Sequence, residues 1–188
     1  MENILAQAKK IADGAEVFIV SSEATPVQFE ANRLKHIQSK QSHTVALRII
    51  KEGKIGYGVT TDPADSQRLV DMALATAEFG MPAGFELPAS TAYPKTKTYD
   101  RKIESISLKE MIKLGEELIA TVRGHTPDIV CEAEVTKNVI SVSIINSCGG
   151  EVNYKKSIFN LGISGSLIGE NDMLFVGEGE SRCHPILE

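Results

Sequence analysis

The sequence lacks the long apolar runs and the leader that would direct the protein to a membrane. It has no stretch of about 18 apolar residues, the length that spans a bilayer as a helix. Its first residues, MENILAQAKKIADG, have no basic start followed by an uninterrupted apolar run, so no signal peptide is predicted. The 3 cysteines are widely spaced and match no C-x-x-C pattern, which argues against disulfides. We expect a cytoplasmic protein without membrane contact.

Motifs of catalysis and cofactor binding are also missing. The sequence contains no His-Glu-x-x-His, no G-x-S-x-G, no P-loop, and no G-x-G-x-x-G between a strand and a helix. His36 and His43 occupy strands and a turn, where their spacing does not place two ligands on one helical face. The pair Cys183-His184 lies in an acidic segment near the C-terminus, which favours a chain end over a nucleophile pair. We predict no catalytic residue, no metal site and no cofactor in this chain.

The composition is that of an ordinary globular domain. The 188 residues are 42% hydrophobic and 24% charged, enough to bury one core. The net charge of −5 argues against a dedicated nucleic-acid binder. A basic group does occur early in the chain and consists of Arg33, Lys35, Lys40, Arg48, Lys51 and Lys54. We interpret it as solvated charge at strand edges and turns, and a nucleic-acid contact is the alternative.

The segment 26–61 has the pattern of a β-meander. In its clearest hairpin, the corner is Glu52-Gly53, and apolar residues alternate in both arms: Val45, Leu47 and Ile49, then Ile55, Tyr57 and Val59. We expect these apolar residues to form the buried face. The other face of the second arm carries Gly56 and Gly58, which weaken a strand unless another backbone or side chain approaches closely there.

Three helices are predicted around this meander. The first covers residues 3–13 and precedes a strand at 16–20. The second begins at Asp62-Pro63, with the carboxylate as cap and proline in the first turn, and reaches residue 80. Its buried residues are predicted to be Leu69, Val70, Ala73 and Ala77. Residues 81–105 hold three prolines without periodicity and predict an extended connector.

The third helix begins at Ser107, whose spacing to Glu110 predicts a capping box, and ends at Gly124. Its predicted buried residues are Leu108, Met111, Ile112, Leu118, Ile119 and Val122. Four strands are expected after it, at 128–135, 139–146, 151–168 and 173–176, with corners at 137–138, 147–150 and 169–172.

The order of one helix and four strands therefore occurs twice, at 3–61 and 107–178, separated by the helix 62–80 and the connector 81–105. We predict a single α+β domain over 1–188, with helices packed on largely antiparallel β-meanders.

Two groups of residues resemble a known family. The first comprises Glu30, Asn32, Arg33 and Leu34, then Val45-Ala46-Leu47-Arg48, Gly53-Lys54-Ile55-Gly56-Tyr57, and Thr60-Thr61 before an Asp-initiated helix. The second comprises Asn146-Ser147, Gly149-Gly150-Glu151 and Tyr154. Together they resemble the N-terminal domain of the TldD/PmbA family, once called modulators of DNA gyrase, and the resemblance covers essentially the whole chain.

The resemblance implies a bacterial or archaeal cytoplasmic protein related to metallopeptidases that cleave peptides and assemble as dimers. The family's zinc-binding helix, with a His-Glu-x-x-x-His pattern, belongs to a C-terminal domain and has no matching positions here. Zinc is therefore expected only in that absent domain, and no catalytic residue is carried over. The chain is either part of a longer protein or a naturally short relative, and either a catalytic or an inactive-partner type.

Two functions remain open. In the first, the chain is the substrate-handling and dimer-forming domain of such a peptidase or of its non-catalytic partner, and its strand edges accept an extended peptide or unfolded polypeptide segment. In the second, it is a free-standing interaction module that contacts nucleic acid or a DNA gyrase complex. The candidate binding residues are Asn146, Ser147, Gly149 and Gly150, where two glycines permit close backbone approach and Asn146 and Ser147 offer polar groups. A purely structural hairpin turn is the alternative for this corner.

Overall fold

The computed structural model describes residues 1–62, 64–170 and 172–186. They fall into two compact units. Unit 1 comprises Met1–Ser22, Ser42–Thr96 and Ile140–Lys155. Unit 2 comprises Glu23–Gln41, Lys97–Val139 and the described part of Lys156–Glu188. None of the described helices is long and apolar enough to cross a membrane.

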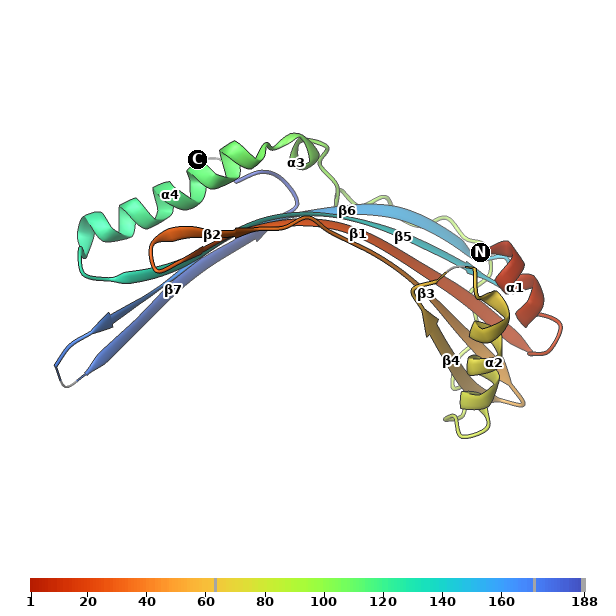
Figure 1. Cartoon of the computed structure of the whole chain (residues 1–188). Coiled ribbons are helices and arrows are strands. Elements are labelled where there is room, and N and C mark those ends of the chain that lie inside the picture. The colour runs from red at the N-terminus through yellow and green to blue at the C-terminus, as the bar shows by residue number, and fades with distance from the viewer. Residues whose placement is uncertain (63, 171, 187–188) are drawn as a thin grey trace. The chain divides into compact units, whose positions relative to one another are not determined.

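The elements are four helices and seven strands over the described residues (Figure 1). The helices are α1 (Glu2–Ala8), α2 (Ser66–Ala77), α3 (Lys102–Ser105) and α4 (Leu108–His125). The strands are β1 (Gly14–Glu30), β2 (Arg33–Ile37), β3 (Lys40–Lys51), β4 (Lys54–Thr60), β5 (Val130–Asn146), β6 (Glu151–Ile168) and β7 (Met173–Arg182). Hydrogen bonds join them in the order β4-β3-β1-β5-β6-β7, with β2 paired to β1. The α+β class with an antiparallel sheet is confirmed.

In unit 1, the predicted hairpin forms with its predicted corner, since Lys51 pairs with Lys54. The buried face of β4 differs from the prediction. Gly56 and Gly58 lie opposite the buried Ile49 and Leu47, whereas Tyr57 and Val59 are exposed. A side chain on Gly56 would overlap the carbonyl of Ala73 in α2, and one on Gly58 would come within 2.5 Å of the Leu69 carbonyl. The glycines therefore let α2 pack directly on the strand backbone.

Helix α2 is shorter than predicted. It begins at Ser66, because the Asp62 carboxylate accepts the Ala64 amide in a turn before the helix (2.9 Å). Pro63, predicted in the first turn, lies outside the described residues. The helix ends at Ala77, and the predicted buried residues Leu69, Val70, Ala73 and Ala77 are confirmed. Helix α1 likewise ends at Ala8, before the predicted residue 13.

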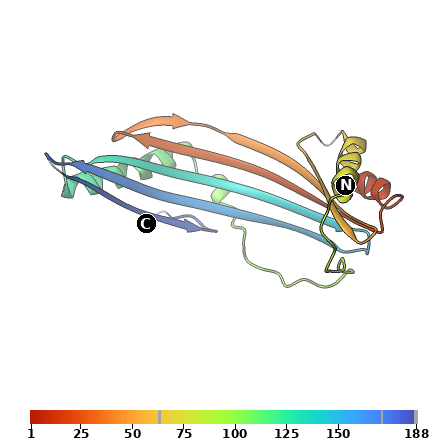
Figure 2. The ribbon, with the colours of Figure 1, turned by 90° about the horizontal axis from the view of Figure 1, so that it is seen from below.

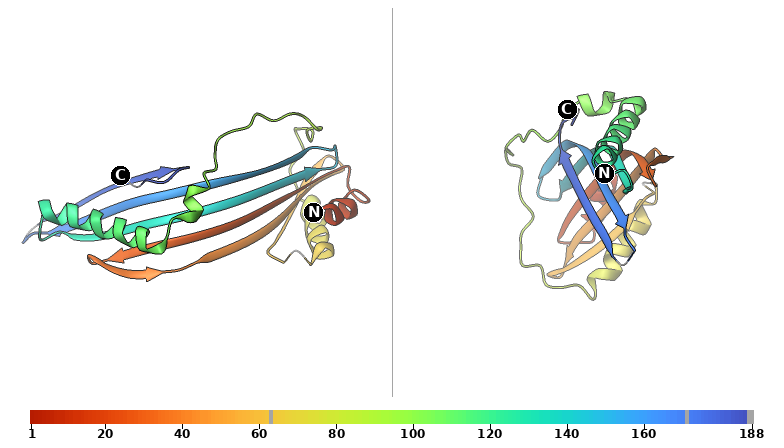
Figure 3. Two further views of the ribbon diagram at one scale, coloured as in Figure 1. Left: turned by 90° about the horizontal axis from the view of Figure 1, so that it is seen from above. Right: turned by 90° about the vertical axis from the view of Figure 1, so that its left-hand side faces the viewer.

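In unit 2, α4 packs along the sheet (Figure 3) and begins with the predicted capping box. The Ser107 amide donates to the Glu110 carboxylate (2.8 Å), and the Glu110 amide donates to Ser107 Oγ (3.2 Å). The hydrogen bond from the Ser107 side chain lowers the pKa of Glu110, and the bond from the Ser107 backbone adds to this. Leu108, predicted to be buried, is 45% exposed, and the helix continues one residue past Gly124. Its buried residues are Met111, Gly115 and Ile119.

Two strands are longer than predicted. Strand β1 joins the predicted strand at 16–20 and the start of the meander into one strand of 17 residues. Strand β5 crosses the predicted corner at 137–138 without a turn. Lys137 lies within this strand, and its ammonium donates to the carbonyls of Glu104 (3.1 Å) and Ile106 (2.5 Å). The second half of the chain therefore has three strands after its long helix where four were predicted.

Replacing Gly56 with alanine tests the contact between β4 and α2. We expect Gly56→Ala to lower the free energy of unfolding by about 3 kcal/mol, because the new Cβ displaces the helix. Gly84→Ala is the matched control, since nothing lies within 4 Å of a Cβ there. Chemical denaturation of both variants measures the difference. Equal stabilities would contradict the packing described for Gly56.

Candidate functional site

The four predicted binding residues lie together in the turn between β5 and β6, in unit 1. Asn146 is 5% exposed, and its side chain makes three hydrogen bonds within the chain. Its Nδ2 donates to the Pro88 carbonyl (2.8 Å), and its Oδ1 accepts the amides of Cys148 and Gly150 (both 2.9 Å). Asn146 thereby forms the turn and fixes the connector to it.

The remaining turn residues have structural partners as well. Ser147 exchanges two hydrogen bonds with Ala15, from its amide to the Ala15 carbonyl (2.8 Å) and from the Ala15 amide to its Oγ (3.1 Å). Gly149 has a φ of +84°, which side-chain-bearing residues rarely adopt. This geometry accounts for the residue types at the turn, and a binding role for them stays a prediction.

Replacing Asn146 with alanine removes three hydrogen bonds and leaves the buried Gly150 amide without its side-chain acceptor. We expect Asn146→Ala to lower the free energy of unfolding by about 3 kcal/mol. Asn153→Ala is the control, because the Asn153 amide is exposed and donates to Glu151. Thermal or chemical unfolding checks this. An Asn146→Ala protein as stable as the parent, with reduced peptide binding, would favour the binding role.

Strand β7 has an unoccupied edge within unit 2. Its register with β6 runs from Met173 opposite Ile168 to Arg182 opposite Phe159. Its ten residues are all exposed, and β6 is its strand neighbour in the described part of the chain (Figure 2). A strand edge of this length offers a row of backbone donors and acceptors to another chain.

The hairpin geometry shows which backbone groups face outward. The Gly169 amide donates to the Asp172 carbonyl (2.9 Å), which makes this a hydrogen-bonded pair. Antiparallel pairs alternate between bonded and non-bonded, so the outward groups of β7 belong to its odd-numbered residues, among them Phe175, Gly177 and Gly179. The outward amide of Gly179 is held by the neighbouring Glu178 carboxylate (3.2 Å).

The β4 edge, in unit 1, is closed by contrast. Thr76 Oγ1 on α2 lies 2.8 Å from both the amide and the carbonyl of Tyr57. The Ile55 amide donates to the Met81 carbonyl (2.9 Å), and the Ala83 amide donates to the Gly53 carbonyl (2.7 Å). Helix α2 and the start of the connector thus occupy the positions that an added strand would take.

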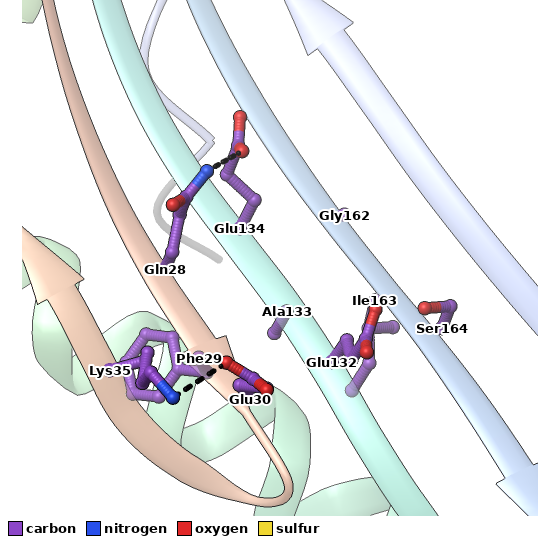
Figure 4. Close-up of a pocket in the computed structure, with 10 residues that line it drawn as sticks. All are labelled: Gln28, Phe29, Glu30, Lys35, Glu132, Ala133, Glu134, Gly162, Ile163 and Ser164. Carbon is purple, nitrogen blue, oxygen red and sulfur yellow. Dashed lines mark hydrogen bonds and ion pairs between the residues drawn. The ribbon is translucent and has the colours of Figure 1, made fainter.

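A groove of about 470 Å³ lies on the sheet surface of unit 2 and is lined by β1, β2, β5 and β6 (Figure 4). Within it, Lys35 pairs with Glu30 (3.0 Å), and Gln28 donates to Glu134 (2.9 Å). The lining is acidic, because it contains three carboxylates, Glu30, Glu132 and Glu134, and one basic side chain, Lys35. Its residues are Gln28, Phe29, Glu30, Lys35, Glu132, Ala133, Glu134, Gly162, Ile163 and Ser164.

A second groove, of about 360 Å³, lies on the α4 side of the sheet of unit 2. Leu118 of α4 and Leu161 and Ile163 of β6 provide apolar surface. Glu178 and Glu180 of β7 provide two carboxylates. Arg182 forms an ion pair with Glu180. The free edge of β7 is thus bordered by an apolar surface with negative charge beside it.

The described residues contain no group of three His, Cys, Asp or Glu side chains placed to hold a metal ion. His43 Nδ1 lies 2.9 Å from Ser21 Oγ, and His36 Nε2 lies 3.4 Å from Gln38 Oε1. The Cys183 carbonyl accepts from Ser157 Oγ (2.8 Å). Among the residues that the structure describes, no zinc site is therefore identified.

Half of the early basic group is held by partners in the chain. Arg48 pairs with Glu16 (2.7 Å) and lies 4.7 Å from the Phe85 ring centre. Lys35 pairs with Glu30, and Lys54 donates to the Glu78 carbonyl (2.9 Å). These contacts favour the interpretation as strand-edge and turn charge.

Binding to DNA should accordingly be weak and lost at moderate salt. The reasons are the net charge of −5 and the three basic side chains already held within the chain. Titration of labelled duplex DNA at increasing salt measures this. Sequence-selective binding that persists at roughly physiological salt would contradict it.

The sequence prediction did not find the β7 edge, because the strand was expected to end at Val176. Residues 177–182, GEGESR, have no apolar alternation and look like part of an acidic tail. A period of two is present nonetheless, since glycine and glutamate alternate. That alternation was the available signal for a continued strand.

Comparison with known proteins finds a partial family match and one curated relative. Residues 15–77 match the family model described as PmbA/TldA metallopeptidase domain 1. An uncharacterised protein of Methanocaldococcus jannaschii is 28% identical over 97% of this chain. The chain is thus similar to the first domain of that family over residues 15–77. It spans 41% of the length of that relative.

Solved structures share the fold at low sequence identity. TldE from Thermococcus kodakarensis superimposes with a TM-score of 0.85 at 16% identity, over 100% of this chain and 44% of that chain. A proposed modulator of a DNA gyrase from Thermotoga maritima gives 0.80 at 16% identity, over 98% of this chain and 42% of that chain. A similar protein from Bacteroides thetaiotaomicron gives 0.81 at 16% identity, over 96% of this chain and 43% of that chain.

Proposed function

We propose that this chain is the substrate-handling and dimer-forming domain of a PmbA/TldD-type zinc-dependent peptidase or of its non-catalytic partner, acting in the cytoplasm. Its proposed partners are an extended peptide or unfolded polypeptide segment and a second subunit of the same family. The family match supports the relation to peptidases. In this proposal, residues outside this chain supply the proteolytic chemistry. The described residues form no group of His, Cys, Asp or Glu side chains that could hold a metal ion.

The observation that carries the proposal is the free edge of β7. An extended polypeptide binds such an edge by adding a strand, and its backbone then pairs with the outward groups of Phe175, Gly177 and Gly179. Each backbone hydrogen bond contributes about 1 kcal/mol, so three or four of them give weak, reversible binding. Binding by strand addition depends more on the backbone of the peptide than on its side chains. This suits a protein that handles unfolded segments of varied sequence.

The closed β4 edge supports the proposal that peptide binding takes place at β7. There, Thr76 already bonds both backbone groups of Tyr57, so an incoming strand would have to displace α2. Strand β2 is a weaker candidate, because it has five residues against the ten of β7. Length matters, since each added residue pair contributes further hydrogen bonds.

Amide hydrogen exchange measured by NMR tests this proposal. On addition of an unstructured ten-residue peptide, we expect slower exchange at the amides of Phe175 and Gly177, because they become donors to the peptide. The amide of Tyr57 is the internal control and should not change, since Thr76 already accepts it. Unchanged exchange along β7 at saturating peptide would contradict the proposal.

A further inference from the structure

The free edge of β7 carries its acidic side chains on one face of the sheet. Glu178 and Glu180 lie opposite Ile163 and Leu161 of β6, so they project to the side that α4 covers. Gly177 and Gly179 lie opposite Ser164 and Gly162, and they project to the other side. A strand added beside β7 must follow the same alternation, because directly opposed residues share a face.

We infer that the segment received at β7 is basic at alternate positions, with lysine or arginine on the side facing α4. This inference rests on the proposed edge binding and names the chemistry of its ligand. Side chains there would lie beside Glu178 and Glu180, at the groove of about 360 Å³. The residues that line this groove include two carboxylates and no basic group. An acidic segment would be repelled at the same positions.

The apolar part of this groove suits the long stem of a basic side chain. Leu118, Leu161 and Ile163 provide apolar surface next to the two carboxylates. Lysine and arginine cover apolar surface with their methylene groups and keep the charged end at the rim. A short cation or a purely apolar side chain would use one of these features and not the other.

Glu178 is the more available of the two carboxylates. Glu180 already pairs with Arg182, whereas Glu178 accepts the outward amide of its neighbour Gly179 (3.2 Å). A carbonyl of the added strand would replace the Glu178 carboxylate at that amide. The carboxylate is then released to pair with a basic side chain on the same strand, so edge pairing and charge pairing occur together.

Gly177 and Gly179 leave space on the side of the sheet that faces away from α4. Neither Gly177 nor Gly179 has a side chain, and their partners Ser164 and Gly162 are small. Beside Gly177 and Gly179, residues of the added strand on that side therefore meet few side chains of β6 and β7. Sequence selectivity should come from the side facing α4.

Three ten-residue peptides that differ in one residue type test the inference. In each, threonine alternates with lysine, glutamine or glutamate, and anisotropy of a fluorescent label on the peptide measures binding to the 188-residue chain. We expect the lysine peptide to bind about fivefold more tightly than the glutamine peptide, and the glutamate peptide to bind most weakly. The preference should shrink as salt is raised.

Two variants of equal net charge separate pairing at β7 from general attraction. Glu178→Gln and Glu132→Gln each remove one negative charge, taking the net charge from −5 to −4. We expect Glu178→Gln to reduce the preference for lysine over glutamine about threefold. Glu132→Gln, on the other groove, should leave it unchanged.

The outcomes distinguish the preference for basic peptides from the proposed edge binding at β7. Equal affinities for the three peptides, together with slower amide exchange along β7, would overturn the basic preference and leave edge binding intact. Equal losses in the two variants would also overturn it, because the attraction would then be non-specific. A lysine preference without any change in exchange along β7 would overturn both. The peptide series on the unaltered chain decides the matter even if a variant folds poorly.

Discussion

The two-residue alternation of the long strands is the constraint on which the rest of the structure depends. Strands β1 and β5 have 17 residues each and contribute to both units. Odd-numbered side chains of β1 are buried in each, Ala15 and Val17 in one core and Val27 and Phe29 in the other. A slip of one residue would turn all of them out of their cores. The alternation of β1 therefore determines which of its residues contribute to each core.

The same alternation determines what is left for binding. On β4, glycines on the buried side allow α2 to approach so closely that Thr76 bonds the strand edge. On β7, glycines and glutamates alternate, and the outward edge has no strand or helix on it among the described residues. The β4 edge is thus closed by the fold, and the β7 edge is available. This asymmetry is the physical basis for assigning peptide binding to β7.

Local sequence patterns predicted the elements whose signals are short-range. The hairpin corner at Glu52-Gly53 and the capping box of Ser107 and Glu110 were confirmed, because each depends on a few adjacent residues. The corner predicted at Lys137-Asn138 was wrong, since Lys137 is held by carbonyls some 31 to 33 residues away. The buried face of β4 was also wrong, because hydrophobicity suggested Tyr57 and Val59 while the approach of α2 required glycine. The four residues predicted at the turn of Asn146 do lie together in the structure. The second half of β7 was not predicted, because residues 177–182 have no apolar side chains.

The most direct test of the account is an experimental structure of the chain with a bound lysine-threonine peptide. The account predicts an extra strand beside β7, with peptide backbone atoms bonded to Gly177 and Gly179 and a lysine next to Glu178. A peptide bound instead in the turn of Asn146, or in the groove lined by Glu30, Glu132 and Glu134, would contradict it.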